Sequence, residues 1–192
     1  MYDDTTPPLF AFPASFPRLE TCRLRLRPIA LEDAERIFEL YSDPRVAEYD
    51  DFEPYTDKAA ALRCVEATLG AFDSGRNLRW VLAPKEDDRF IGSCGLSDFD
   101  EEARRAEIGY DLLPREWGKG FMSEAVAAVL DYGFGAMGLN RIEAFITPGN
   151  AASVRVLEKN GFSREGLVRE RDYFRGRLWD GILMAILRRD RA

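Results

Sequence analysis

A short glycine-containing loop, Trp117-Gly-Lys-Gly-Phe-Met122, lies between an expected strand and an expected helix. Glycines allow a backbone to approach a ligand closely, and the N–H groups at the beginning of a helix attract anions. Lys119 adds a positive charge. The spacing differs from that of the loops that bind nucleoside triphosphates and dinucleotides. The loop therefore predicts a site for another ligand with a diphosphate group, and a turn that binds nothing is the alternative.

The 192 residues include no histidine, which limits the chemistry of any active site built from this chain. Catalytic triads that need histidine and histidine-ligated zinc are excluded within one chain. Cys22, Cys64 and Cys94 are too widely spaced for a Cys-x-x-Cys site, so we expect reduced thiols and no metal. Proton transfer must therefore use carboxylates, tyrosine, lysine, serine, cysteine, the backbone or water.

The composition is typical of a folded domain, with 46% hydrophobic and 32% charged residues. Lys and Arg total 27 against 34 Asp and Glu, and the chain has no basic block, which disfavours a nucleic-acid partner. No run approaches the ~18 apolar residues that cross a membrane, so no membrane partner is expected. The acidic start, Met1-Tyr-Asp-Asp4, does not resemble a signal peptide, and we expect a cytoplasmic protein.

The chain divides into an arm and one domain. Residues 1–17 contain four prolines among aromatic and small residues, which predicts an irregular arm ahead of a single domain at residues 18–192. The apolar side chains of this arm either cover the core of their own chain or contact a second subunit. They are Leu9, Phe10, Phe12 and Phe16.

Hydrophobic periodicity in the domain predicts alternating strands and helices that place the glycine loop after a strand. The expected strands are residues 21–28, 80–83, 90–96, 106–113 and 142–147, followed by two around 172–180. The expected helices are residues 31–41, 57–75, one that begins at Ser123, and 150–159. Residues 42–56 are expected to form a loop, and a polar turn at 85–88 predicts a hairpin. This order indicates a mixed α/β sheet.

Further motifs follow the glycine loop at fixed places. They are Thr147-Pro-Gly-Asn-Ala-Ala-Ser153 and Lys159-Asn-Gly-Phe162. With the loop, they resemble the GNAT superfamily of acetyl-CoA-dependent N-acetyltransferases, over about residues 19–187. The opening LETCRLRLRPIALEDAERIFEL and the strand Glu107-Ile-Gly-Tyr110 are most similar to its RimJ/RimL-like branch of ribosomal-protein serine/alanine acetyltransferases. The resemblance implies a mostly antiparallel sheet of about seven strands with about four helices, splayed between the strands near Asp111 and Ile142.

The resemblance also implies a site for acetyl-CoA. In the glycine loop, Trp117 replaces the family's Gln or Arg and Met122 replaces a small residue, but backbone N–H groups remain as phosphate donors. The N–H near Leu112 is expected to hold the thioester carbonyl, and Asn150 to contact the pantetheine arm or simply cap a helix. The implied cofactor-binding residues are Leu112, Leu113, Trp117, Gly118, Lys119, Gly120, Phe121, Met122 and Asn150.

The implied catalytic residues differ from the commonest family pattern. Leu157 occupies the position where many members carry a tyrosine, and the branch instead offers a serine that corresponds to Ser153, as proton donor to the leaving thiolate. A helix-capping role is the alternative for Ser153. Glu107 and Asp172 are both candidates for the base that accepts the amine proton. The alternative for each carboxylate is a structural ion pair with a nearby arginine. The arginines available are Arg104, Arg105, Arg169 and Arg171.

The acceptor implied by the family is a primary amine, either a protein N-terminus or a small amine. Residues 43–53 contain five acidic side chains. Either these side chains attract a cationic acceptor, or the segment is simply a solvated loop. A noncatalytic domain that only binds acyl-CoA is the alternative to an enzyme. We expect a homodimer, because members of this branch are often dimers.

Overall fold

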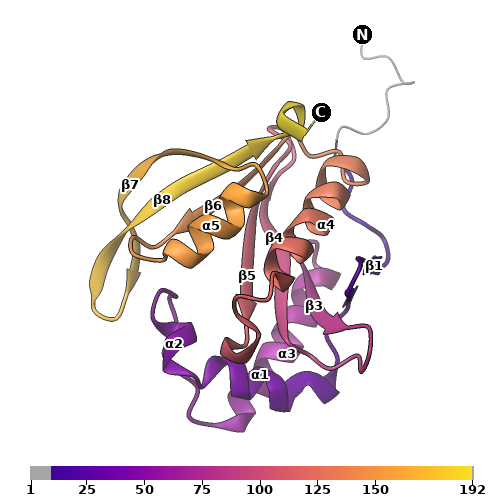
Figure 1. Cartoon of the computed structure of the whole chain (residues 1–192), viewed down its shortest axis with the longest axis vertical. Helices are drawn as coiled ribbons and strands as arrows, with labels where there is room; N and C mark the ends of the chain where they lie inside the picture. The colour runs from indigo at the N-terminus through magenta and orange to yellow at the C-terminus, as the bar shows by residue number, and fades with distance from the viewer. Residues whose placement is uncertain (1–9, 192) are drawn as a thin grey trace.

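The computed structural model describes residues 10–191. Within them, eight strands form one mixed sheet (Figure 1). Its order is β1-β2-β3-β4-β5-β6-β8-β7, and all neighbours are antiparallel except β5 and β6. The bounds are β1 Leu19–Glu20, β2 Leu24–Arg27, β3 Asn77–Pro84, β4 Gly92–Asp100, β5 Arg105–Leu112, β6 Arg141–Ile146, β7 Ser163–Phe174 and β8 Arg177–Leu187. The strand beyond the expected seven is the two-residue β1.

Five α-helices cover the two faces of this sheet. Their bounds are α1 Ala34–Tyr41, α2 Pro44–Ala47, α3 Lys58–Asp73, α4 Phe121–Gly135 and α5 Ala151–Lys159. Alternation along β3 assigns the faces, because Trp80 packs with α4 whereas Val81 packs with α1 and α3. The expectation of a plain loop over residues 42–56 misses α2, a single turn that begins at Pro44 and is capped by the Asp43 side chain.

The sheet splays between β5 and β6, as expected. These parallel strands pair only from Arg105 with Arg141 to Glu107 with Glu143. Beyond this point β5 stays paired with β4 as far as Leu112, while β6 stays paired with β8 as far as Ile146. The diverging halves leave backbone groups of β5 without a neighbouring strand on one side. This gap positions the candidate site.

The described part of the arm packs on its own chain. Phe10, Phe12 and Phe16 contact the core on the α4 face, and the carbonyl of Pro17 accepts a hydrogen bond of 2.7 Å from Nε1 of Trp80. Leu9, which was also expected to cover apolar surface, lies outside the described residues. The three phenylalanines therefore cover apolar surface of their own chain.

Candidate active site

A cleft of about 600 Å³ lies where β5 and β6 diverge. The glycine loop and the start of α4 line it together with the second half of β5. The opposite wall comes from the end of β6, from one face of α5 and from Arg171, Asp172 and Phe174 of β7. Residues 45–51, at and after α2, complete the lining. The splay thus brings segments from the whole domain to one cavity.

The glycine loop exposes its backbone to this cleft. Gly118 and Gly120 have φ angles of +75° and +81°, a left-handed conformation that glycine adopts without strain. A Cβ atom added at Gly118 would meet nothing within 4 Å, and one at Gly120 would meet only an Arg23 nitrogen at 3.5 Å. Gly120 is the N-cap of α4 and offers no capping side chain. The first N–H groups of α4 therefore suit an anionic ligand such as the diphosphate of acetyl-CoA.

The side chains of the loop take different directions. Met122 is buried and turns into the core, as its replacement of a small residue requires. Trp117 is 47% exposed, and its indole Nε1 donates a 2.7 Å hydrogen bond to the carbonyl of Leu112. Lys119 does not line the cleft, because its ammonium group binds the Glu116 carboxylate at 3.0 Å. The loop therefore presents backbone donors to the cleft but not the expected lysine charge.

The end of β5 directs one backbone donor into the splay. The N–H of Leu113 donates to the Ile91 carbonyl at 2.9 Å, on the β4 side. Because successive residues of a strand direct their backbone groups to opposite sides, the N–H of Leu112 points away from β4, where β6 has diverged. Leu112 lines the cleft at this point. The buried Leu113 does not line the cleft, and its N–H is occupied, so its expected role in cofactor binding has no geometric support.

Ser153 and Asn150 lie together at the start of α5. The Oδ1 atom of Asn150 accepts a hydrogen bond of 3.1 Å from the N–H of Ser153, so Asn150 is the N-cap of the helix and also lines the cleft. The Oγ atom of Ser153 lies 2.7 Å from the hydroxyl of Tyr110 on β5. Sequence reasoning used Tyr110 only as part of a motif. Its position two residues before Leu112, on the same face of β5, was the available signal.

One arginine joins the two expected base candidates. Arg171 lies 3.0 Å from Oε2 of Glu107 and 2.7 Å from Oδ1 of Asp172, and its guanidinium covers the ring of Phe145 at 3.5 Å. Burial raises the pKa of Glu107, and the charge of Arg171 opposes this only in part. Glu107 is the less exposed of the two carboxylates, at 25% against 38%. Both residues line the cleft, so the ion pairs with Arg171 are compatible with a role in proton transfer.

A second group of carboxylates comes from the acidic segment 43–53. Glu48, Asp50 and Asp51 line the cleft. The Thr147 hydroxyl donates a 2.8 Å hydrogen bond to the carbonyl of Tyr49 and thereby holds this segment against the end of β6. Burial raises the pKa of Asp50 to about 7, with a further contribution from the charge of Asp111.

The two ends of the acidic segment do not line the cleft. Asp43 caps α2 and pairs with Arg45, and Glu53 is largely exposed. Arg175 at the turn between β7 and β8 donates to the carbonyls of Ala47 and Phe52. Figure 1 shows this turn near α2. The contacts fix the middle of the segment at the cleft.

A largely buried carboxylate, Asp111, forms part of the cleft lining, and sequence reasoning gave it no role in the site. Asp111 on β5 accepts hydrogen bonds from the hydroxyl of Tyr41 at 3.0 Å and from the guanidinium of Arg79. Burial and the charge of Asp111 raise the pKa of Tyr41 well above its ordinary value. These residues come from α1, β3 and β5, and no spacing in the sequence relates them.

The described residues contain no group of three or more Cys, Asp or Glu side chains placed to hold a metal ion. The three cysteines are unpaired: Cys22 is exposed and Cys94 is buried. Within residues 10–191, no helix is long and apolar enough to cross a membrane.

Comparisons with known proteins agree with this geometry. The family model described as an acetyltransferase (GNAT) domain matches residues 23–163. The N-acetyltransferase p20 of Bacillus licheniformis is 42% identical over 174 residues, which cover 91% of this chain and 98% of that protein. RimJ of Mycobacterium smegmatis in complex with CoA-disulfide superimposes with a TM-score of 0.75 and 27% identity, covering 85% of this chain and 81% of RimJ.

Spermidine N-acetyltransferase of Vibrio cholerae, in complex with CoA and spermine, also gives a TM-score of 0.75, with 26% identity over 87% of this chain and 96% of that one. The family match spans the glycine loop, most of the splayed strands and the start of α5. The chain belongs to the GNAT family and is an acetyl-CoA-dependent N-acetyltransferase.

Proposed function

We propose that this enzyme transfers the acetyl group of acetyl-CoA to the primary amine of a small, multiply charged cation. The observation that carries this proposal is the set of carboxylates around one part of the cleft. Glu48, Asp50 and Asp51 line it from the acidic segment, and Asp172 lines it from β7. The full lining contains seven carboxylates and four cationic side chains, Arg45, Arg155, Lys159 and Arg171, so negative charge is in excess. An excess of charge of one sign concentrates ligands of the opposite sign. An acceptor with a second ammonium group therefore gains more here than one with a single charge.

In this proposal, backbone groups bind the acetyl-CoA. The N–H groups of the glycine loop and the start of α4 hold the diphosphate, and Asn150 contacts the pantetheine arm. The N–H of Leu112 donates to the thioester carbonyl oxygen, which gains negative charge when the amine attacks. The proposed contact residues are Leu112, Trp117, Gly118, Gly120, Phe121, Met122 and Asn150, all of which line the cleft.

The acceptor amine must lose protons and the leaving thiolate must be stabilised. We assign the first task to Glu107 through a water molecule, because its burial raises its pKa toward the range useful for a base. Asp172, which is paired with the same Arg171 as Glu107, is the alternative base. Ser153 donates a hydrogen bond to the departing thiolate and so stabilises its charge, and the Tyr110 hydroxyl, 2.7 Å away, supports the Ser153 hydroxyl.

A peptide N-terminus is the second candidate acceptor. The similarity to RimJ supports it, whereas the similarity to a spermidine acetyltransferase supports the small cation. The two candidates differ in charge. An N-terminal Ser or Ala peptide without basic residues carries a single ammonium group, which can balance the charge of only one of the carboxylates on the acidic segment.

A turnover screen tests the proposal. Purified enzyme is given acetyl-CoA with diamines and polyamines, with alkyl monoamines of matched length, and with peptides that begin with Ser or Ala. Mass spectrometry identifies each product. We expect kcat/KM for the polyamine to exceed that for the matched monoamine by about tenfold or more, because each additional charge pair contributes. Faster acetylation of the peptides would overturn the small-cation assignment.

We also propose that two copies of the chain associate. The edge strand β7 and its partner β8 expose Leu167, Val168, Tyr173 and Leu178. The aromatic arm is less suited to this task, because its described phenylalanines cover the core of their own chain. Light scattering at micromolar concentration distinguishes a dimer from a monomer.

A further inference from the structure

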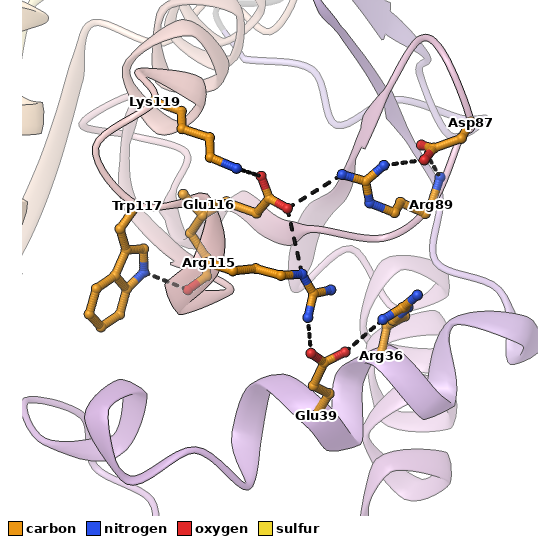
Figure 2. A network of polar contacts seen from close by, with 9 residues as sticks. Arg36, Glu39, Asp87, Arg89, Arg115, Glu116, Trp117 and Lys119 are labelled. Atoms are coloured by element: carbon orange, nitrogen blue, oxygen red, sulfur yellow. Dashed lines mark hydrogen bonds and ion pairs between the residues drawn. The ribbon is translucent and has the colours of Figure 1, made fainter.

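Glu116 lies directly before the glycine loop (Figure 2). Its side chain is only 3% exposed. Three cationic groups surround its carboxylate. The Lys119 ammonium lies 3.0 Å from Oε2, and nitrogens of Arg89 and Arg115 lie 3.4 and 3.6 Å from Oε1. Burial raises the pKa of Glu116, but the bonds from Lys119 and Arg89 outweigh it and leave the pKa below its ordinary value. The carboxylate is therefore ionised at neutral pH.

The cations that meet at Glu116 connect the glycine loop to two other parts of the fold. Arg89 follows the turn between β3 and β4 and also binds Asp87. Arg115 also binds Glu39 on α1. Figure 2 shows Lys119, Arg89 and Arg115 converging on the Glu116 carboxylate, with Arg115 reaching Glu39 of α1 on its other side. A shift of the loop relative to α1 or to the β3–β4 turn would therefore break several of these bonds at once.

The same contacts determine the direction of Lys119. Its ammonium group binds Glu116, and its carbonyl accepts a hydrogen bond of 2.9 Å from Arg23. Glu116 lines the cleft, as do Gly118 and Gly120 on either side of the lysine, whereas Lys119 does not. The positive charge that the sequence offered to a phosphate is thus used to neutralise a buried carboxylate, which would otherwise be costly to bury.

We propose that Glu116 is the positioning residue of the coenzyme site: it fixes the glycine loop with its N–H groups toward the cleft and keeps Lys119 as an internal partner instead of a phosphate ligand. This inference rests on the proposed binding of the diphosphate by the loop. Affinity for the negatively charged coenzyme then depends on Glu116, which is itself negatively charged. The buried carboxylate acts through the backbone that it holds.

The test compares Glu116→Gln, Lys119→Met and the double variant with the parent. Calorimetry measures the Kd for coenzyme A itself, and kinetics measures kcat and the KM for acetyl-CoA. Lys58→Met is the matched control, because Lys58 forms only an exposed pair with Glu35. We expect Glu116→Gln to raise Kd and KM about tenfold or more while kcat changes less than about threefold. A merely damaged fold would instead lower kcat through loss of active enzyme.

Lys119→Met is expected to raise Kd by less than about threefold, and to have no further effect when Glu116 is already Gln, because Lys119 acts through Glu116. An increase of about tenfold in Lys119→Met would show that the lysine contacts the phosphates and would overturn the proposal. An unchanged Kd in Glu116→Gln would overturn it as well. If Glu116→Gln does not fold, Lys119→Met alone still decides whether the lysine is a phosphate ligand. A parent enzyme that binds no coenzyme A would contradict the proposed role of the loop itself.

Discussion

The hydroxyl of Tyr110 lies 2.7 Å from Oγ of Ser153 and 3.2 Å from the backbone carbonyl oxygen of Ser153. Ser153 is also held through its N–H by Asn150. Burial raises the pKa of Tyr110, and the bond to Ser153 opposes this only partly, so the phenol stays protonated at neutral pH. It can therefore donate to Ser153 when the serine proton turns toward the cleft.

Replacing either member of this pair is expected to slow the reaction without loss of coenzyme. Ser153→Ala removes the proton donor and should lower kcat about 100-fold, and Tyr110→Phe should lower it about tenfold by removing the support. The Kd for coenzyme A, measured by calorimetry, should stay within about threefold of the parent. Tyr132→Phe on α4 is the control. A Tyr110→Phe enzyme with full kcat would show that Ser153 needs no partner.

The two carboxylates on Arg171 are expected to behave differently. Glu107→Gln should lower kcat/KM about 100-fold, and Asp172→Asn should lower it much less. The base acts only when deprotonated, so activity of the parent falls as the pH drops below the raised pKa of Glu107. This acid-side decline should disappear in Glu107→Gln.

Rate measurements from acidic to neutral pH with the true acceptor check the assignment. If Asp172→Asn lost most of its kcat/KM while Glu107→Gln kept that of the parent, Asp172 would be the base instead of Glu107. If neither variant is slower, the chain supplies no carboxylate base, and catalysis rests on positioning, the N–H of Leu112 and an amine that arrives neutral.

Gly120→Glu is expected to abolish binding of acetyl-CoA. The substitution places a side chain at a φ of +81° and a negative charge at the start of α4, where the diphosphate is proposed to bind. In the parent, acetyl-CoA at about 100 times its Kd should add about 2.7 kcal/mol to the stability and raise Tm by a few degrees. Gly135→Glu adds the same charge at the exposed end of α4 and should keep this shift. A folded Gly120→Glu protein with normal affinity would refute the proposed phosphate site.

Local signals predicted most of the framework from the sequence. In β2, buried Leu24 and Leu26 alternate with arginines, and the Asp57 side chain caps α3 by accepting from the N–H of Ala59. Alternation and capping depend only on neighbouring residues, so they can be recognised in one dimension. The short α2 was missed because four residues give no periodicity, although Asp43-Pro44 is a helix-start signal.

The site was less predictable because its geometry depends on contacts between distant segments. The direction of Lys119 depends on Glu116, whose burial results from the packing of α1 and the β3–β4 turn. The occupied N–H of Leu113 follows from the register of β5 against β4. The motifs therefore indicated the loop, Leu112 and Ser153 as candidates, whereas the directions of the side chains could be read only from the fold.

The pKa of Asp50 rises from 3.8 to about 7 in the folded chain, mainly through burial and then through the charge of Asp111. At a pH between these two pKa values, the Asp50 carboxyl group has lost its proton in the unfolded chain but keeps it in the folded chain. The stabilising contribution of Asp50 is therefore complete below about pH 4 and is lost as the pH rises to about 7. Asn cannot ionise, so Asp50→Asn should become more stable relative to the parent over this range.

Thermal melting of both proteins at about pH 4.5 and about pH 7.5 measures this effect, and the difference in Tm should grow by a few degrees. Asp51→Asn removes a charge from the exposed neighbour and controls for charge alone. The same ionisation bears on the acceptor, because a cation binds the ionised carboxylate more tightly. The KM of the parent for a cationic acceptor should fall as the pH rises through about 7, and this trend should be weaker in Asp50→Asn. Equal trends in the two enzymes would remove Asp50 from acceptor binding.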